Sequence, residues 1–189
     1  ITHMHPDHIG GLIPLLFYRK IFSIDSPLTL IGPPQLRIYF EDCFHHSGLT
    51  NKQDLQWIDI SAINQLGIQD HIEIFALEMK HKIPCWGYKI SDSDNSLVFI
   101  TDTLPNSNAV TLANNADILI HEATYDHHMR EKAKEHFHTT EIQAMEIADE
   151  AKVRRLILTH FSQRLSNKDV EKWYWNGKPC IVFDERVEI

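Results

Sequence analysis

The sequence has few cysteines and no pairing pattern among them. Only three occur in 189 residues, Cys43, Cys85 and Cys180, and no two have the Cys-x-x-Cys spacing. The number is too small, and odd, for the disulfide framework of a small secreted domain. A disulfide-stapled fold is therefore excluded, and a reducing, cytoplasmic location is favoured.

Positive charge is also scarce. Lys and Arg number 18 against 26 Asp and Glu, which gives a formal net charge of −8. A protein that tracks nucleic acid over a broad surface is usually basic, because contacts to phosphates supply much of the affinity. The charge argues against such a surface but leaves room for a local basic patch. Bound divalent ions would add positive charge where a phosphate sits.

The sequence shows no long apolar run, internal repeat or low-complexity linker, and we expect no signal peptide. No apolar segment approaches the roughly 20 residues that span a bilayer. The hydrophobic fraction of 43% is enough for one domain with a substantial core. We expect a single domain over residues 1–189 and no membrane partner.

Histidine, in contrast, is abundant, with 13 residues. The stretch Thr2–Gly11 places His3, His5, Asp7 and His8 within six consecutive positions. Imidazole and carboxylate are the ligands that zinc and similar ions prefer. A His-x-His pair at a strand end can point both rings at one ion, and the next two ligands can reach a second. A histidine-rich polar loop without a metal is the alternative.

The spacing of apolar residues predicts both helices and strands along the chain. Ile9, Leu12, Ile13 and Leu16 have helical spacing and follow a strand that ends at Ile1-Thr2. Because a strand needs neighbours, we expect a fold whose opening strands precede this sequence. We predict strands at Leu28–Ile31, Leu55–Ile60, Ile72–Met79, Gly87–Ser91, Leu97–Thr101, Asp117–His121 and Leu156–Thr159. One helix is predicted at Leu36–Phe44, and another begins at a capping box formed by Thr140 and Gln143. Turns are predicted at Asn64–Asp70 and Asp92–Asn95.

Several potential ligands follow the ends of predicted strands, and strand ends on one rim of a sheet converge. Taken alone, His81 would be interpreted as a structural histidine and Asp102 as a turn residue. Both follow the end of a predicted strand, however, and this position favours a metal site. The predicted ligands of the first ion are His3, His5 and His81, those of the second are Asp7, His8 and His160, and Asp102 bridges both.

Such a ligand set leaves an open position for water on each ion. Two ions about 3.5–4 Å apart would share a hydroxide, whose parent water can have a pKa near 7, and this hydroxide is the expected nucleophile. Zinc is the first candidate for the ions, and manganese and iron also fit the ligands.

The string Thr-His-x-His-x-Asp-His-x-x-Gly at Thr2–Gly11 resembles the signature of the metallo-β-lactamase superfamily. This resemblance implies an αβ/βα sandwich with further strands before the motif, and a one- or two-metal site that hydrolyses esters, amides, thioesters or phosphodiesters. The later strings at Thr101–Thr103, His121–Tyr125, His138–Thr140 and Leu158–Arg164 resemble the ribonuclease Z family of tRNA 3′-processing endonucleases, so that the likeness covers Ile1 to about Arg164.

The resemblance also implies roles for residues that bind no metal. His138 would take part in proton transfer and phosphate stabilisation, which suits imidazole near neutral pH. His136 is the rival candidate. Apart from the resemblance, we expect Asp7 to assist the attacking water as a base besides binding metal, Glu122 to orient His138, and Arg164 to contact a phosphate.

One feature of ribonuclease Z is missing. The stretch from Ser91 to Ser96 stands where the long basic arm that grips tRNA would lie, and its six residues cannot form such an arm. The favoured function is a dinuclear phosphodiesterase that acts on RNA 3′ ends or on a smaller phosphodiester. A cyclic-nucleotide or other small-ester hydrolase and a catalytically silent metal-binding module are the alternatives. Relatives in the family are often dimers, so a homodimer is compatible with this reading.

Overall fold

The computed structural model describes residues 1–47, 55–62, 65–68, 71–163, 165 and 170–180. The chain forms two compact units, the first made of residues 1–64 and 83–85 and the second of residues 65–82 and 86–189. Each unit is described by itself. No helix within the described ranges has the length and apolar character needed to cross a membrane.

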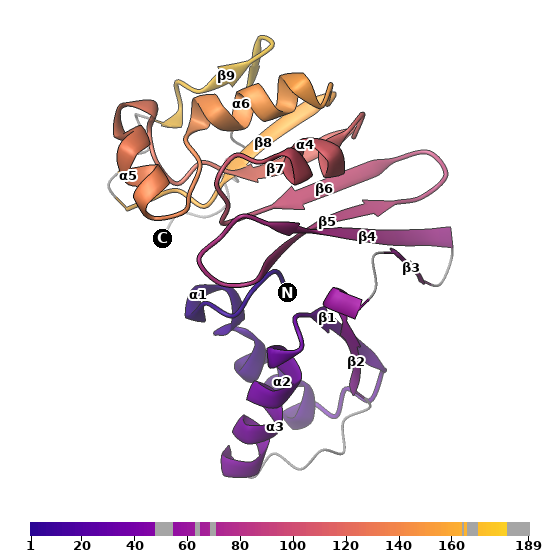
Figure 1. Cartoon of the computed structure of the whole chain (residues 1–189). Coiled ribbons are helices and arrows are strands. Elements are labelled where there is room, and N and C mark those ends of the chain that lie inside the picture. The colour runs from indigo at the N-terminus through magenta and orange to yellow at the C-terminus, as the bar shows by residue number, and fades with distance from the viewer. Residues whose placement is uncertain (48–54, 63–64, 69–70, 164, 166–169, 181–189) are drawn as a thin grey trace. The chain divides into compact units, whose positions relative to one another are not determined.

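The first unit is a parallel strand pair with helices (Figure 1). Strands β1 (Leu28–Gly32) and β2 (Leu55–Asp59) pair in parallel, and α3 (Gln35–Ser47) lies between them in the sequence, after α1 (Pro6–Ile9) and α2 (Leu12–Ile21). The core joins apolar residues that recur at helical spacing and on β1: Ile9, Leu12, Leu16, Leu30, Leu36, Phe40 and Phe44.

The predictions for this unit are confirmed in part. The helix expected after Pro33-Pro34 forms, because proline is tolerated where the first-turn N–H groups have no helical partner. The strand expected at Ile1-Thr2 does not form. Instead, the Ile1 amino group donates to the Ile31 carbonyl at 2.8 Å, a contact at the side of β1.

The second unit is a six-stranded sheet in the order β3-β4-β5-β6-β7-β8. Its strands are β3 (Gln65–Ile68), β4 (Ile72–Met79), β5 (Cys85–Ser91), β6 (Ser96–Ile100), β7 (Ile118–Glu122) and β8 (Arg155–Thr159). The pairs β3–β4 and β5–β6 are antiparallel, whereas β6–β7 and β7–β8 are parallel. The parallel strands therefore end at the same edge of the sheet.

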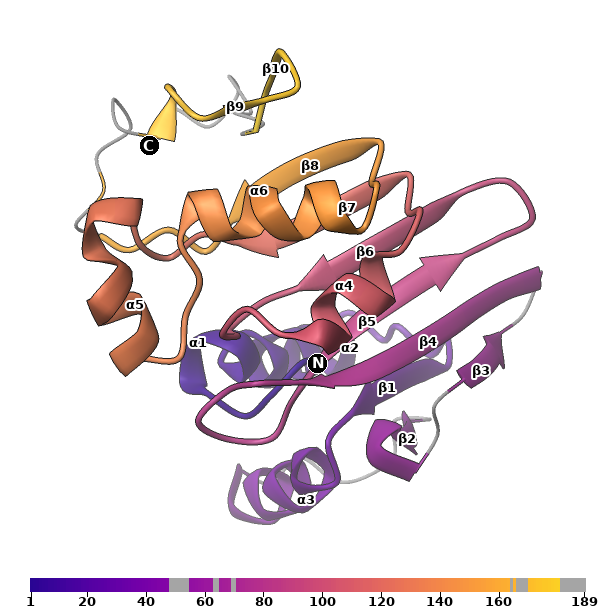
Figure 2. The ribbon, with the colours of Figure 1, turned by 45° about the horizontal axis from the view of Figure 1, so that its top comes forward.

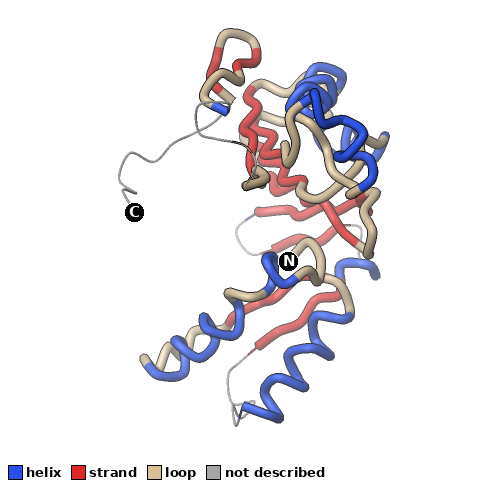
Figure 3. The backbone as a smooth tube through the Cα atoms, turned by 90° about the vertical axis from the view of Figure 1, so that its left-hand side faces the viewer, coloured by secondary structure: helices blue, strands red, loops and turns tan. Residues whose placement is uncertain are grey.

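Helices of the second unit cover one face of this sheet (Figures 2 and 3). They are α4 (Ser107–Ala113) and α6 (Glu141–Glu150), and the short elements η3 (His127–Met129) and α5 (Arg130–Glu135) lie beside them. Buried side chains from the helices and strands, such as Leu112, Ile147, Val98 and Leu119, form the core between the layers. The C-terminal strands β9 (Tyr174–Trp175) and β10 (Lys178–Pro179) form a separate antiparallel pair.

Most predicted elements of this unit are confirmed. The β5–β6 hairpin closes through Asp92, whose carboxylate accepts from the N–H groups of Asp94 and Asn95. The capping box at Thr140 and Gln143 is present. The connection predicted over Asn64–Asp70 is wrong in part, because Gln65–Ile68 pairs with β4 as an edge strand. The α/β class is confirmed, and one domain over residues 1–189 stays a prediction.

Candidate metal centre

Polar side chains of the second unit follow the ends of its strands. Asp102 comes two residues after β6, His160 directly follows β8, and His81 comes two residues after β4. Asp102 and His160 have left-handed backbones, with φ of 47° and 58°. Such a conformation is uncommon for residues other than glycine, and strained residues tend to cluster at functional sites. Two of the three predicted ligands of this unit, Asp102 and His160, therefore have an uncommon backbone conformation.

The hydrogen bonds of His160 fix which ring nitrogen carries its proton. Thr124 donates its only hydroxyl hydrogen to Glu122 Oε2 at 2.5 Å. Thr124 Oγ1 must then accept from His160 Nδ1, which lies 2.8 Å away. The neutral ring of His160 therefore has no proton on Nε2, and this nitrogen lies 3.3 Å from Asp102 Oδ1.

His81 is held in the same way by a backbone carbonyl. Its Nδ1 donates to the Phe137 carbonyl oxygen at 3.1 Å, because a carbonyl can only accept. Phe137 has a φ of 62°, so the chain bends sharply at the residue that supplies this acceptor. The neutral ring presents its lone pair on Nε2, 3.8 Å from Asp102 Oδ2.

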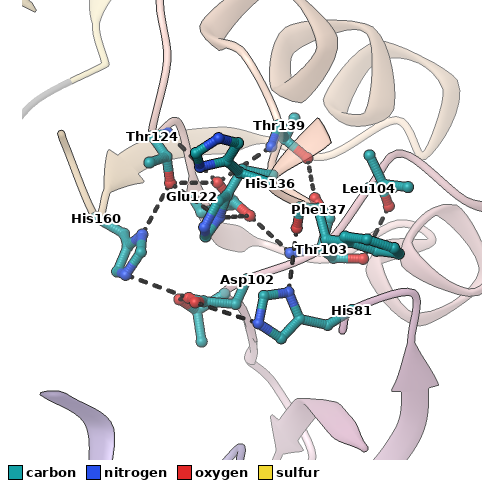
Figure 4. Close-up of polar contacts among 12 residues, drawn as sticks. His81, Asp102, Thr103, Leu104, Glu122, Thr124, His136, Phe137, Thr139 and His160 are labelled. Atoms are coloured by element: carbon teal, nitrogen blue, oxygen red, sulfur yellow. Dashed lines mark hydrogen bonds and ion pairs between the residues drawn. The ribbon is translucent and has the colours of Figure 1, made fainter. Parts of the chain in front are cut away.

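Two imidazole lone pairs thus face the oxygens of one buried carboxylate (Figure 4). Groups that are all acceptors repel one another unless a cation lies between them. Nitrogen and carboxylate oxygen are the donors that zinc and similar divalent ions take. The partner on each Nδ1 is the usual second contact of a metal-binding histidine. The residues present therefore fit a divalent cation.

The first unit gathers the ligands predicted from the sequence motif. His3 Nε2 lies 3.0 Å from His5 Nδ1, and the ring centroids of His3 and His8 are 4.1 Å apart. The carboxylate of Asp7 lies 3.3 Å from His8 Nε2, and its side chain is 69% exposed. His3 is fully buried, and its Nδ1 contacts Thr2 Oγ1 at 3.1 Å. The turn of α1, with Pro6 at its start, brings these four ligands together.

Glu122 ties the loops of the second unit together. Its carboxylate is fully buried and accepts from the Thr103 N–H at 2.6 Å and the Thr139 N–H at 3.1 Å. The same carboxylate lies 3.0 Å from His138 Nδ1. Because a carboxylate can only accept, His138 donates from Nδ1 and presents Nε2. The structure thus places Glu122 against His138, and the orienting role of Glu122 stays a prediction.

Replacing Glu122 by glutamine should destabilise the protein. Oε1 accepts from the Thr103 N–H, and Oε2 accepts from the N–H groups of Thr124 and Thr139. Either orientation of the new amide group therefore sets a donor against a buried donor. We expect the free energy of unfolding to fall by about 2–4 kcal/mol, since each unsatisfied buried donor costs about 1–3 kcal/mol.

Urea denaturation measures this loss, with the exposed Glu146 on α6 as the control. The substitution Glu146→Gln makes the same chemical change without a buried partner. Equal midpoints for the two variants would contradict the role of Glu122.

The remaining predicted residues differ in where the structure places them, and one lies outside the described residues. The ligand atoms of Asp102, His138 and His160 lie within 4.8 Å of one another, which places His138 at the centre. His136 is exposed and contacts the Tyr125 hydroxyl at 3.3 Å. Arg164 falls outside the described residues.

Two contributors to the site were missed by sequence reasoning. Thr124 links Glu122 to His160, and the Phe137 carbonyl holds His81. Thr124 belongs to the string His121–Tyr125 that carried the resemblance, so the string held a signal. A backbone carbonyl leaves no residue signature, and Phe137 could be placed only by the fold.

Comparison with known proteins agrees with this geometry. Residues 1–161 match the beta-lactamase superfamily domain. Ribonuclease BN of Proteus mirabilis is 30% identical over 219 residues, which cover 89% of this chain and 72% of the relative. Ribonuclease Z of Limosilactobacillus reuteri is 28% identical, over 89% of this chain and 71% of its own length.

The fold is also similar to that of solved structures. Human tRNase Z, short form, superimposes with a TM-score of 0.75 at 29% identity, over 87% of this chain and 72% of that one. Together with the matched domain and the similar sequences, this identifies the fold as that of the metallo-β-lactamases, whose members bind divalent metal ions. The chain belongs to the metallo-β-lactamase superfamily of hydrolases, within its ribonuclease Z family.

Proposed function

We propose that this protein is a dinuclear metal-dependent endonuclease that cleaves a phosphodiester at the 3′ end of RNA. His3, His5 and His81 would hold the first ion, Asp7, His8 and His160 would hold the second, and Asp102 would contribute to both. The main support is the pair of histidine Nε2 atoms that face the Asp102 carboxylate, because neutral rings in this arrangement favour a cation between them. We propose zinc for both ions, since the ligands are imidazoles and carboxylates.

The divalent ions, when bound, supply activation of water and neutralise charge on the phosphoryl oxygens. The protein's own side chains do the rest. Asp7 is largely exposed, so it can reach solvent water and accept a proton from it. When protonated, His138, held by Glu122 through Nδ1, carries on Nε2 the proton that the leaving 3′ oxygen needs. Glu122 also stabilises the protonated ring, because its charge is opposite.

RNA as substrate is supported by the relatives, which are named ribonuclease BN, ribonuclease Z and tRNase Z. A second candidate is a smaller phosphodiester such as a cyclic nucleotide. It is favoured by the β5–β6 hairpin, which closes in the four residues Asp92–Asn95 and leaves no room for a tRNA-gripping arm.

Metal removal tests the proposed function. The protein loaded with zinc should hydrolyse bis(p-nitrophenyl) phosphate and release the trailer from a precursor tRNA. Chelation should abolish both activities, and added Zn²⁺ or Mn²⁺ should restore them. The reason is that the imidazoles and carboxylates of the proposed site cannot replace the metal as a Lewis acid. The activities are followed by nitrophenolate absorbance and by gel electrophoresis.

The outcomes separate the alternatives. Turnover of a cyclic nucleotide without cleavage of precursor tRNA would replace the RNA substrate by the small phosphodiester. Tight metal binding with no turnover of any phosphodiester would identify a silent metal-binding module and reject the enzyme.

We also propose that the protein is a cytoplasmic homodimer. None of the three cysteines, all of which the structure describes, forms a disulfide, as expected in a reducing compartment. The helix α2 and the residues after it expose large apolar side chains, among them Phe17, Ile21 and Phe22, which a second copy would cover. Sedimentation at the mass of a monomer across micromolar concentrations would reject the dimer.

A further inference from the structure

A basic pocket lies beside His138 in the second unit. It has a volume of about 520 Å³, which is within the range of pockets that hold small ligands. Lys80, directly after β4, and Arg130 and Lys134 of α5 line it together with His138. Among the described residues that line it, Glu131 is the only carboxylate. The pocket is therefore locally positive in a chain whose formal net charge is −8.

The arrangement of α5 produces this charge. Arg130 and Lys134 are four residues apart, so they lie on the same face of the helix. Lys132, between them, is exposed and does not line the pocket. In the part of the chain that the structure describes, no ion pair joins Lys80, Arg130 or Lys134 to a carboxylate. Their charges thus remain available to an anion.

The neutral polar side chain in the pocket also donates. Gln143 lines it, and its Oε1 already accepts from the Thr140 N–H in the capping box. Its amide nitrogen is consequently the group left for a ligand. Lysine and arginine side chains bind phosphate through charge-assisted hydrogen bonds, and arginine can do so in a bidentate manner. The chemistry of the lining therefore matches a phosphate on a larger molecule.

We propose that this pocket binds the phosphate immediately 5′ to the scissile bond of the RNA. The inference rests on the proposed function, in which His138 gives a proton to the leaving 3′ oxygen. That oxygen belongs to the upstream nucleotide, whose own 5′ phosphate is the next one along the strand. A pocket lined by His138 is therefore on the upstream side of the cut. In this way α5 supplies an RNA contact to a chain that has no basic arm.

A synthetic RNA tests the assignment of the phosphate. In one substrate, a neutral methylphosphonate replaces the phosphate on the 5′ side of the scissile phosphate. In a second substrate, the methylphosphonate replaces the phosphate on the 3′ side of the scissile phosphate. For the native protein, the 5′ replacement should lower kcat/KM about tenfold, the effect of one charge-assisted hydrogen bond. The 3′ replacement should have a smaller effect.

A protein variant, combined with the modified RNA, gives a double-mutant cycle. In Arg130→Ala/Lys134→Ala, cleavage of the unmodified RNA should fall about tenfold, and the 5′ replacement should cost nothing more, because charge and partner are removed together. Lys132→Ala on the same helix is the matched control and should behave as the native protein. Additive losses in the double variant would place the phosphate elsewhere and overturn the inference.

Binding of the cleaved product provides a readout without turnover. The upstream RNA with a free 3′ hydroxyl retains the phosphate in question, and its Kd follows from fluorescence anisotropy. Arg130→Ala/Lys134→Ala should raise this Kd about tenfold and reduce the salt dependence of binding. If the double variant binds the product as tightly as the native protein, and the native protein cleaves RNA, only the assignment of the phosphate to this pocket is rejected. If the native protein cleaves no RNA, the proposed function is rejected.

Discussion

Replacing Asp102 by asparagine should remove the metal ions and lower the rate of phosphodiester hydrolysis by roughly 10³-fold or more. Asp102 is 2% exposed, and its two oxygens face His81 and His160. The amide has nearly the same volume but no charge. One of its N–H groups can donate to a histidine Nε2, which removes a lone pair that a metal would use.

The same reasoning predicts that the variant stays folded. A buried carboxylate facing two acceptors is unfavourable without a cation, whereas an amide facing them can form hydrogen bonds. The metal-free variant should therefore melt at or above the temperature of the metal-free native protein. Metal content is measured by mass spectrometry after gel filtration, and the rate with bis(p-nitrophenyl) phosphate.

Asp94 offers a matched control. It is an exposed residue of the β5–β6 turn, so Asp94→Asn makes the same chemical change away from the candidate centre. This variant should keep both its metal and its activity. If Asp102→Asn also retained its full metal content and turnover, Asp102 would not be the bridging ligand.

Local signals explain why much of the fold could be predicted. The alternation of apolar and turn residues located β1, β4 and the parallel strands, and Asp92 and Thr140 marked a turn and a helix start through contacts within three residues. The short edge strand β3 escaped prediction because Gln65–Ile68 is held by pairing with β4 and by no pattern of its own.

The candidate site likewise has features that could be predicted from local sequence and features that could not. The sequence motif predicted the grouping of His3, His5 and His8, because a short turn suffices to bring them together. The tautomers of His81 and His160 could not be predicted, since they depend on partners 56 and 36 residues away. Those partners are what turn a set of histidines into a site that fits a cation.

Replacing His138 by alanine should lower kcat for RNA cleavage by about 10²–10⁴-fold, the usual contribution of a general acid. His138 Nδ1 is held by Glu122, which leaves Nε2 for the leaving oxygen. The variant should keep its metal ions, because the proposed ligands are other residues. The ribose 3′ oxygen is a poor leaving group and needs the proton.

A substrate with a good leaving group separates this role from a structural one. Departure of p-nitrophenolate needs no proton, so His138→Ala should lose far less activity on bis(p-nitrophenyl) phosphate than on RNA. The exposed His136 is the control, and His136→Ala should retain nearly native rates on both substrates. Loss of metal from His138→Ala would make His138 a ligand, and equal losses on both substrates would show that it transfers no proton.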